Sequence, residues 1–150
     1  MNLSRIWSMA MSTGFLSVKS SLNLWETLVR SILEYASEIW GGEVWPEGER
    51  VLHDLGRRIL RCSPSTTASA IRGELGLWTL RGRRDLKKLM YFAHILTLPD
   101  DRLVKQAFYF GKERKDLKTN WTGRIKKILV TFKIGSLWNN NNLIWNLDGH

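Results

Sequence analysis

The chain has 150 residues, of which 43% are apolar and 25% charged, and it carries a net charge of +9. This length suffices for one domain with a hydrophobic core, and the composition is that of a soluble globular protein. The single cysteine excludes an internal disulfide, and no apolar run approaches the ~20 residues of a membrane-spanning helix. We therefore expect an intracellular protein, nuclear or cytoplasmic, that has no membrane partner.

The net positive charge comes entirely from the second half of the sequence. Residues 1–75 hold eight lysines and arginines against eight acids, whereas residues 76–150 hold fifteen against six. Such asymmetry predicts a polyanionic partner, most simply RNA or DNA. The alternative is a basic, solvated surface that binds nothing.

The first predicted elements are a short helix over residues 3–12 and a long helix over residues 18–40. Ser20 or Ser21 can cap the start of the long helix, and Gly41 with Gly42 can end it. Its apolar residues recur at steps of three and four, and they are Leu22, Trp25, Val29, Ile32, Ala36 and Ile39. Further apolar residues widen this stripe, so we expect a central helix that is covered on most of its circumference.

A second helix is predicted over residues 46–62, with a proline in its first turn. Arg57, Arg58 and Arg61 project from its last turns, where cations suit the helix dipole without any ligand. A short helix over residues 68–72 follows and ends at Gly73. The glycines of residues 73–76 predict a tight turn.

A helix over residues 80–97 carries the strongest candidate site. Its expected buried residues are Leu86, Leu89, Met90, Ala93, Ile95 and Leu96. Five bases occupy eight residues near its N-terminus, where positive charge is unfavourable; they are Arg81, Arg83, Arg84, Lys87 and Lys88. We interpret this cluster as a site for an external anion.

Two further helices are predicted, over residues 102–110 and 121–133, joined by a polar connector. The second should bury Trp121, Ile125, Ile128, Leu129 and Phe132 and expose Lys126 and Lys127. Residues 120–122 also match a glycosylation sequon, which we interpret as a chance match in an intracellular chain. Residues 136–150 predict a loose, asparagine-rich tail unless Leu143, Ile144 and Trp145 dock.

Together these segments predict an all-α protein. We expect a compact, irregular bundle of about six helices around the central helix at 18–40, in a single domain over residues 1–135.

Few residues in the sequence form a pattern typical of a catalytic or metal site. His53, His94 and His150 are far apart, and only His53 with Glu49 and Cys62 suggests even part of a metal site. We expect no catalytic residue, metal or cofactor.

Several short motifs follow one another along the chain. The clearest is residues 28–41, Leu-Val-Arg-Ser-Ile-Leu-Glu-Tyr-Ala-Ser-Glu-Ile-Trp-Gly. Others are Gly-Arg-Arg-Ile-Leu at 56–60, Ser-Pro-Ser-Thr at 63–66, Arg-Gly-Glu-Leu-Gly at 72–76, Arg83-Arg84, Asp101-Arg102-Leu103 and Trp121. In this order they resemble the region after the polymerase domain of reverse transcriptases from LINE-type, non-LTR retrotransposons, and the resemblance covers residues 15–135.

The resemblance implies a helical thumb or post-thumb region that helps to hold template RNA and target DNA. The chain departs from the family at Ala36, where the family usually has glycine, and it lacks the Tyr-x-Asp-Asp palm, the endonuclease and the Cys/His knuckle. By this resemblance it is a non-catalytic, nucleic-acid-binding fragment. We expect the five bases of residues 81–88 to contact the phosphates, and a second basic surface to be formed by Arg57, Arg58, Arg61, Lys126 and Lys127. Alternatives are a structural fragment that binds other proteins, such as the missing polymerase segments, and a relic reading frame without independent function.

Overall fold

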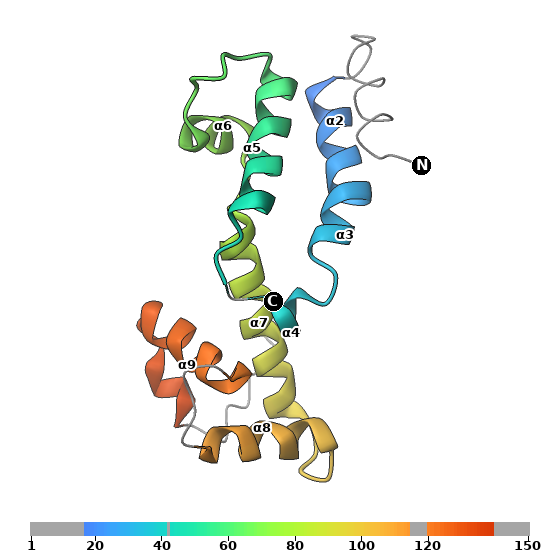
Figure 1. Cartoon of the computed structure of the whole chain (residues 1–150). Helices are drawn as coiled ribbons and strands as arrows, with labels where there is room; N and C mark the ends of the chain where they lie inside the picture. The colour runs from blue at the N-terminus through green and yellow to red at the C-terminus, as the bar shows by residue number, and fades with distance from the viewer. Residues whose placement is uncertain (1–16, 42, 115–119, 140–150) are drawn as a thin grey trace, which may run out of the picture. The chain divides into compact units, whose positions relative to one another are not determined.

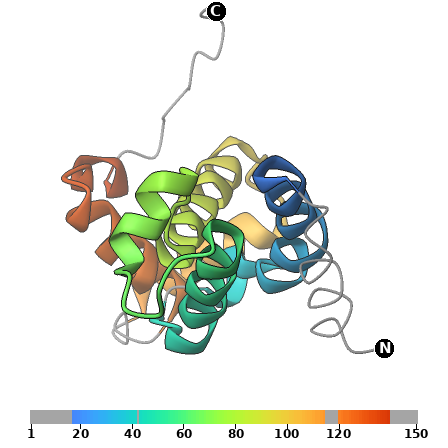
Figure 2. The ribbon, with the colours of Figure 1, turned by 90° about the horizontal axis from the view of Figure 1, so that it is seen from above.

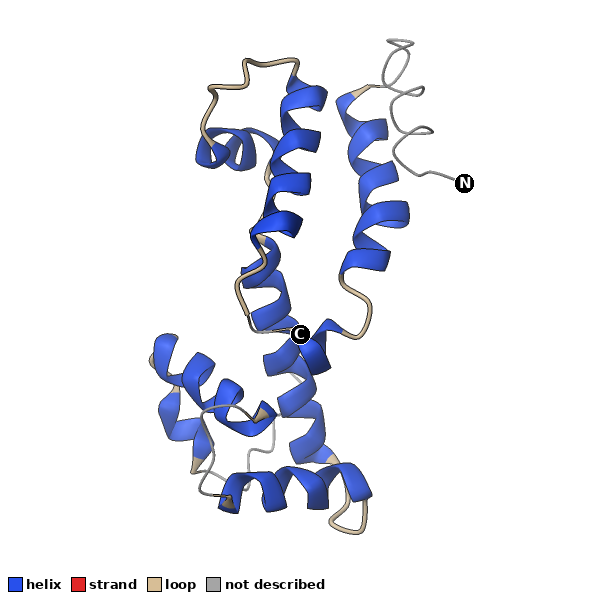
Figure 3. Ribbon diagram, in the orientation of Figure 1, coloured by secondary structure: helices blue, strands red, loops and turns tan. Residues whose placement is uncertain are grey.

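The computed structural model describes residues 17–41, 43–114 and 120–139, and within these ranges all regular secondary structure is helical (Figure 3). The prediction of an all-α bundle is therefore confirmed. The predicted helix at 3–12, residues 115–119 of the predicted connector and the tail beyond residue 139 lie outside the described residues.

The helices follow one another with short connections (Figure 1). They are α2 (Val18–Leu24), the π-helix η1 (Trp25–Arg30), α3 (Ser31–Leu33), α4 (Ser37–Trp40), α5 (Pro46–Leu60), α6 (Ala68–Leu75), α7 (Leu80–Thr97), α8 (Leu103–Glu113), α9 (Trp121–Thr131) and the 3-10 helix η2 (Gly135–Trp138). They divide between two compact units where the sequence predicted one domain. Of the described residues, 17–35 and 43–83 form the first unit, and 36–41, 84–114 and 120–139 form the second.

The predicted central helix is interrupted rather than continuous. Helical backbone runs from Val18 to Leu33, a turn follows, and α4 begins only at Ser37. The N-cap is Ser17, whose hydroxyl accepts from the Ser20 amide at 3.1 Å, and not Ser20 or Ser21. Trp25 is buried as expected, but Ile32 is 61% exposed, so this helix is not covered on most of its circumference.

The interruption is set by Ala36, which has φ 51° and ψ 23°. This left-handed conformation costs an L-residue with a Cβ atom about 1 kcal/mol or more, and it is the conformation that glycine adopts freely. We expected Ala36 to lie within the continuous helix at 18–40, where alanine can replace the family's glycine without disturbing the packing. The structure corrects that expectation.

Replacing Ala36 with glycine should therefore stabilise the protein by about 1 kcal/mol, because the left-handed backbone would no longer carry a Cβ atom. Urea denaturation followed by circular dichroism measures the change. Ala70→Gly, in the first turn of α6, is the matched control and should destabilise by up to about 1 kcal/mol. A loss of stability in Ala36→Gly equal to that in the control would contradict the conformational argument.

The first unit is built around α5. Its core joins Trp25, Leu52, Leu55, Ile59 and Leu80. α5 starts at Pro46, with acids in its first turn and Arg57 and Arg58 in its last, as the helix-dipole argument predicted.

Beside α5, α6 is capped by the Thr67 hydroxyl and continues to Leu75, past the expected end at Gly73 (Figures 1 and 2). Gly76, with φ 63°, ends it.

The second unit has a separate aromatic core, formed by Phe92, Ile95, Phe108, Ile125, Leu129 and Trp138. Trp138 belongs to η2, so the predicted loose tail from residue 136 began too early. Phe132, which was expected inside, is exposed.

Lys105 connects the end of α7 to α8. Its ammonium donates to the Leu98 carbonyl at 2.7 Å and pairs with Asp100 at 2.8 Å.

Candidate nucleic-acid interface

The predicted anion site on α7 lies on a helix whose buried face differs from the expected one. Leu80, Arg84, Lys88, Phe92 and Ile95 are the buried residues of this helix. They follow one another at steps of three and four, as residues on one helical face do. Met90 and Leu86, which were expected inside, are 64% and 46% exposed. Two of the five predicted phosphate-binding bases, Arg84 and Lys88, therefore point into the protein.

Arg83 belongs to an ion-pair network within the first unit. Its Nε lies 2.7 Å from Oε1 of Glu34, a carboxylate that is only 3% exposed. Arg30 reaches the other Glu34 oxygen at 3.6 Å and also pairs with Glu26, and each of these acids lies four residues from it in the sequence. The first turn of α7 is thereby connected to the end of α3, and the Arg83 guanidinium has an internal anion.

Lys88 and Arg84 hold the short helix α4 within the second unit. The Lys88 ammonium, which is fully buried, donates to the carbonyls of Glu38 at 3.2 Å and Ile39 at 3.1 Å. The Trp121 indole N–H donates to the same Glu38 carbonyl at 2.7 Å. The Arg84 guanidinium lies 5.6 Å from the centre of the Trp40 ring. Lys88 thus binds the carbonyl end of α4, which is the electronegative end of a helix, and Arg84 contacts the last aromatic side chain of that helix.

Burial lowers the pKa of Lys88 from 10.5 to about 8, and the positive charges of Arg124 and Arg84 add to this effect. The carboxylates of Asp85 and Glu38 oppose it. Arg81 and Lys87 are the less buried members of the predicted cluster. The inference that these five bases need an external anion is therefore corrected for Arg83, Arg84 and Lys88, because the protein itself supplies their partners.

The three arginines of α5 lie in the first unit. The Arg57 guanidinium pairs with Asp54 at 3.0 Å and donates to the Thr66 carbonyl at 3.3 Å. Arg58 and Arg61 are exposed. Arg61 is the left-handed C-cap of α5, with φ 51°. This group offers two outward guanidinium groups to solvent.

Lys126 and Lys127 are exposed on α9 of the second unit, as predicted. The Lys126 ammonium lies 5.7 Å from the centre of the Trp138 ring, and Lys112 lies 5.2 Å from the same ring. Lys112 also donates to the Trp138 carbonyl at 2.8 Å. Lys126 and Lys112 therefore gather around one tryptophan, while Lys127 is directed to solvent.

The positive charge is unequally divided between the two units. Among the described residues the second unit has eleven lysines and arginines against five acids, whereas the first has nine against seven. Three of the second unit's cations, Arg84, Lys88 and Lys105, are buried. The other eight retain contact with solvent and outnumber its acids.

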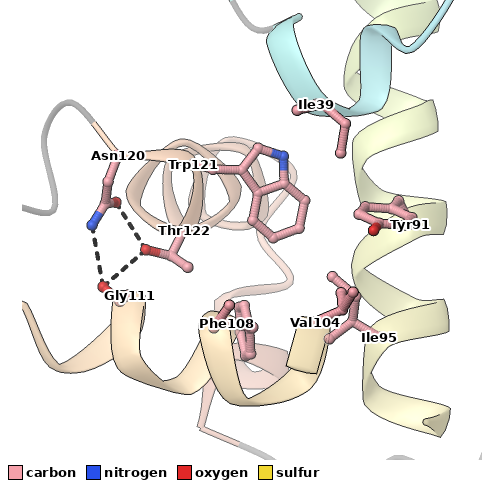
Figure 4. A pocket seen from close by; sticks show the side chains of 10 residues that line it. Ile39, Tyr91, Ile95, Val104, Phe108, Gly111, Asn120, Trp121 and Thr122 are labelled. Atoms are coloured by element: carbon pink, nitrogen blue, oxygen red, sulfur yellow. Dashed lines mark hydrogen bonds between the residues drawn. The ribbon is translucent and has the colours of Figure 1, made fainter. Parts of the chain in front are cut away.

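The second unit also contains an apolar pocket of about 370 Å³ that sequence reasoning did not identify (Figure 4). Its walls include Ile39 of α4, Tyr91 of α7, Val104 and Phe108 of α8, and Trp121 of α9. At one end, Asn120 and Thr122 both donate to the Gly111 carbonyl, at 3.1 and 3.0 Å.

The triplet of residues 120–122, which matches a sequon, explains how α9 begins. Asn120 Oδ1 accepts from the Gly123 amide at 2.7 Å, so the asparagine is the helix N-cap. Asn120 Oδ1 also lies 2.8 Å from the Thr122 hydroxyl, whose single proton is shared between this oxygen and the Gly111 carbonyl. Asparagine before a predicted helix is the one sequence signal that could have located this rim of the pocket.

His53, which the sequence suggested as part of a metal site, contacts an arginine in the structure. His53 Nε2 lies 2.7 Å from Arg72 Nη1, and because a guanidinium only donates, the imidazole must accept. Burial, with Arg72 next, lowers the pKa of His53. Within the described ranges no three His, Cys, Asp or Glu residues form a potential metal site, and no helix is long and apolar enough to cross a membrane.

Comparison with known proteins gives no family to which the chain can be assigned: no family model, curated protein or solved structure matches it.

Proposed function

We propose that the chain is a non-catalytic helical module that binds RNA or DNA through phosphate contacts, and that it is a fragment of a LINE-type reverse transcriptase. The observation that carries the nucleic-acid proposal is the excess of solvent-contacting lysines and arginines in the second unit. Lys126 and Lys127 of α9 are the residues we assign to it first, with Arg58 and Arg61 as a separate group in the first unit.

The relation to the retrotransposon family rests on the sequence motifs, and one backbone feature supports it. The family usually has glycine where this chain has Ala36, and the backbone at Ala36 adopts the left-handed conformation that favours glycine. This left-handed backbone would explain why the family usually has glycine at the corresponding position.

The test is the salt dependence of binding to a fluorescently labelled 20-nucleotide RNA and to DNA of the same sequence. We expect log K to fall linearly with log salt concentration, because phosphate contacts release counterions. Replacing Lys126 and Lys127 with glutamine should reduce the slope by roughly 1 per lysine and weaken binding to all sequences alike.

Lys19→Gln, an exposed lysine of the first unit, is the matched control and should leave the slope unchanged. Binding that does not vary with salt, or a double variant identical to the wild type, would exclude phosphate contacts by α9.

Exposed apolar side chains favour the second candidate, a fragment that binds other proteins. Ile32 and Tyr35 of the first unit and Leu103 and Phe110 of the second are all more than 60% exposed. Where such side chains adjoin to form a contiguous apolar patch, they mark protein interfaces. Light scattering separates the candidates, since a monodisperse monomer at high concentration argues against a surface that needs covering.

A further inference from the structure

We propose that the pocket of the second unit holds one unstacked base of a single-stranded nucleic acid. This inference rests on the proposed function and specifies which part of the ligand the second unit recognises. Single-stranded recognition in general combines phosphate contacts with bases stacked on aromatic side chains. The structure places an aromatic pocket within a unit that carries excess positive charge.

The size and lining of the pocket suit a flat aromatic group. Its volume of about 370 Å³ lies within the usual range for small-ligand pockets. None of the described residues that line it is charged. A phosphate would therefore lose its hydration there without gaining a counterion, whereas a base would bury an apolar face. The lining therefore favours a base over a phosphate, and the phosphates of the strand would contact lysines outside the pocket.

The aromatic side chains of the pocket are held in fixed orientations. Trp121 is anchored through its indole N–H to the Glu38 carbonyl at 2.7 Å. It meets Tyr91 at 79° and Phe108 at 86°, with ring centres 5.7 and 6.3 Å apart. Both contacts are edge-to-face, so neither ring is stacked in parallel on the indole. A wall that is already ordered loses little conformational entropy when a base binds.

Hydrogen-bonding capacity remains at two places on the pocket lining. The Asn120 amide uses one N–H for the Gly111 carbonyl, and its second N–H has no acceptor among the described residues. The Tyr91 hydroxyl likewise makes no hydrogen bond within that part of the chain. Figure 4 shows Tyr91 and Asn120 on opposite sides of Trp121. The edge of a base in the pocket can use one of these groups.

The occupant could instead be an apolar side chain of a partner protein, and charge complementarity favours the base. The second unit has more than twice as many lysines and arginines as acids among its described residues. A strand that inserts one base also brings its neighbouring phosphates close to this unit. An apolar peptide gains nothing comparable.

The experiment compares two fluorescently labelled 12-nucleotide DNAs with equal numbers of phosphates, oligothymidylate and a fully abasic strand. Anisotropy with the full-length protein should show the abasic strand binding about 5- to 100-fold more weakly, the range for one stacked base. Ala107→Trp, which fills the pocket from α8, should remove this preference and leave the salt dependence intact.

Leu103→Trp, one turn earlier on α8 and outside the pocket lining, is the matched control and should keep the preference. Tyr91→Leu provides a second pocket variant and should also reduce it. Equal, salt-dependent binding of both strands by the wild type would overturn the pocket proposal while leaving phosphate binding in place. If neither strand binds, the proposed function fails and the pocket proposal fails with it.

Discussion

Replacing Lys88 with alanine should destabilise the second unit by about 3 kcal/mol. The side chain is fully buried, so its removal leaves a cavity along α7. It also removes the Lys88 donor from the Ile39 carbonyl, while the Glu38 carbonyl keeps the Trp121 indole as its donor among the described side chains. Urea denaturation measures the loss, and hydrogen exchange read by mass spectrometry should localise it to residues 84–114 and 120–139.

Lys127→Ala is the matched control, because it removes an exposed lysine from the same unit. Surface substitutions of this kind usually change stability by less than about 0.5 kcal/mol. If Lys88→Ala were no more destabilising than this control, the two hydrogen bonds to α4 would contribute nothing measurable. α4 would then be held by Arg84 and Trp121.

The same lysine gives the protein a pH dependence that a second variant can isolate. In the folded protein the pKa of Lys88 is about 8, against 10.5 for a solvated lysine, so the folded state loses the proton first. The unfolded chain therefore binds more protons between about pH 8 and 10.5, and wild-type stability should rise through this window. The neutral amine keeps two N–H groups for the two carbonyls.

Lys88→Met keeps an unbranched side chain of similar length but cannot titrate. The difference in unfolding free energy between wild type and Lys88→Met should shift in favour of the wild type by up to roughly 3 kcal/mol across this window. Below pH 8 the difference should be flat. A difference that stays constant from pH 7 to 10.5 would mean that the buried amine keeps its ordinary pKa.

The bounds of several helices were predictable because local signals mark them. Pro46 starts α5, Pro99 follows the end of α7, and Asn120 caps α9. The buried residues Ile125, Ile128 and Leu129 also followed from helical spacing. These features depend on residues close together in the chain, which is why sequence alone could identify them.

The candidate site was less predictable because its partners are distant in sequence. Lys88 meets carbonyls about 50 residues earlier, and a main-chain carbonyl has no signature in the sequence. A hydropathy pattern assigns lysine and arginine to the solvent-exposed side of a helix. It therefore predicted that the face of α7 with Met90 is buried, whereas the structure buries the face with Lys88. The left-handed backbone at Ala36 was also hidden, because alanine is the strongest helix former.

Replacing Gly56 with alanine should destabilise the first unit by about 2 kcal/mol, the reverse of what helix propensity predicts. Alanine stabilises a helix interior by about 1 kcal/mol relative to glycine. At Gly56, however, an added Cβ would come within 2.2 Å of the Ile71 Cγ2 atom. Ile71 is 1% exposed and β-branched, so it cannot rotate away, and α6 must move from α5. Thermal and urea denaturation measure the change.

Gly73→Ala supplies the control within the same helix pair. Gly73 lies inside α6, and an added Cβ would have no atom within 4 Å, so only propensity acts and the variant should gain about 0.5–1 kcal/mol. Ile71→Ala removes the Cγ2 atom, so adding Gly56→Ala to it should cost far less than in the wild type. If Gly56→Ala is stabilising, or if its cost is the same in both backgrounds, close contact between α5 and α6 is not what requires glycine there.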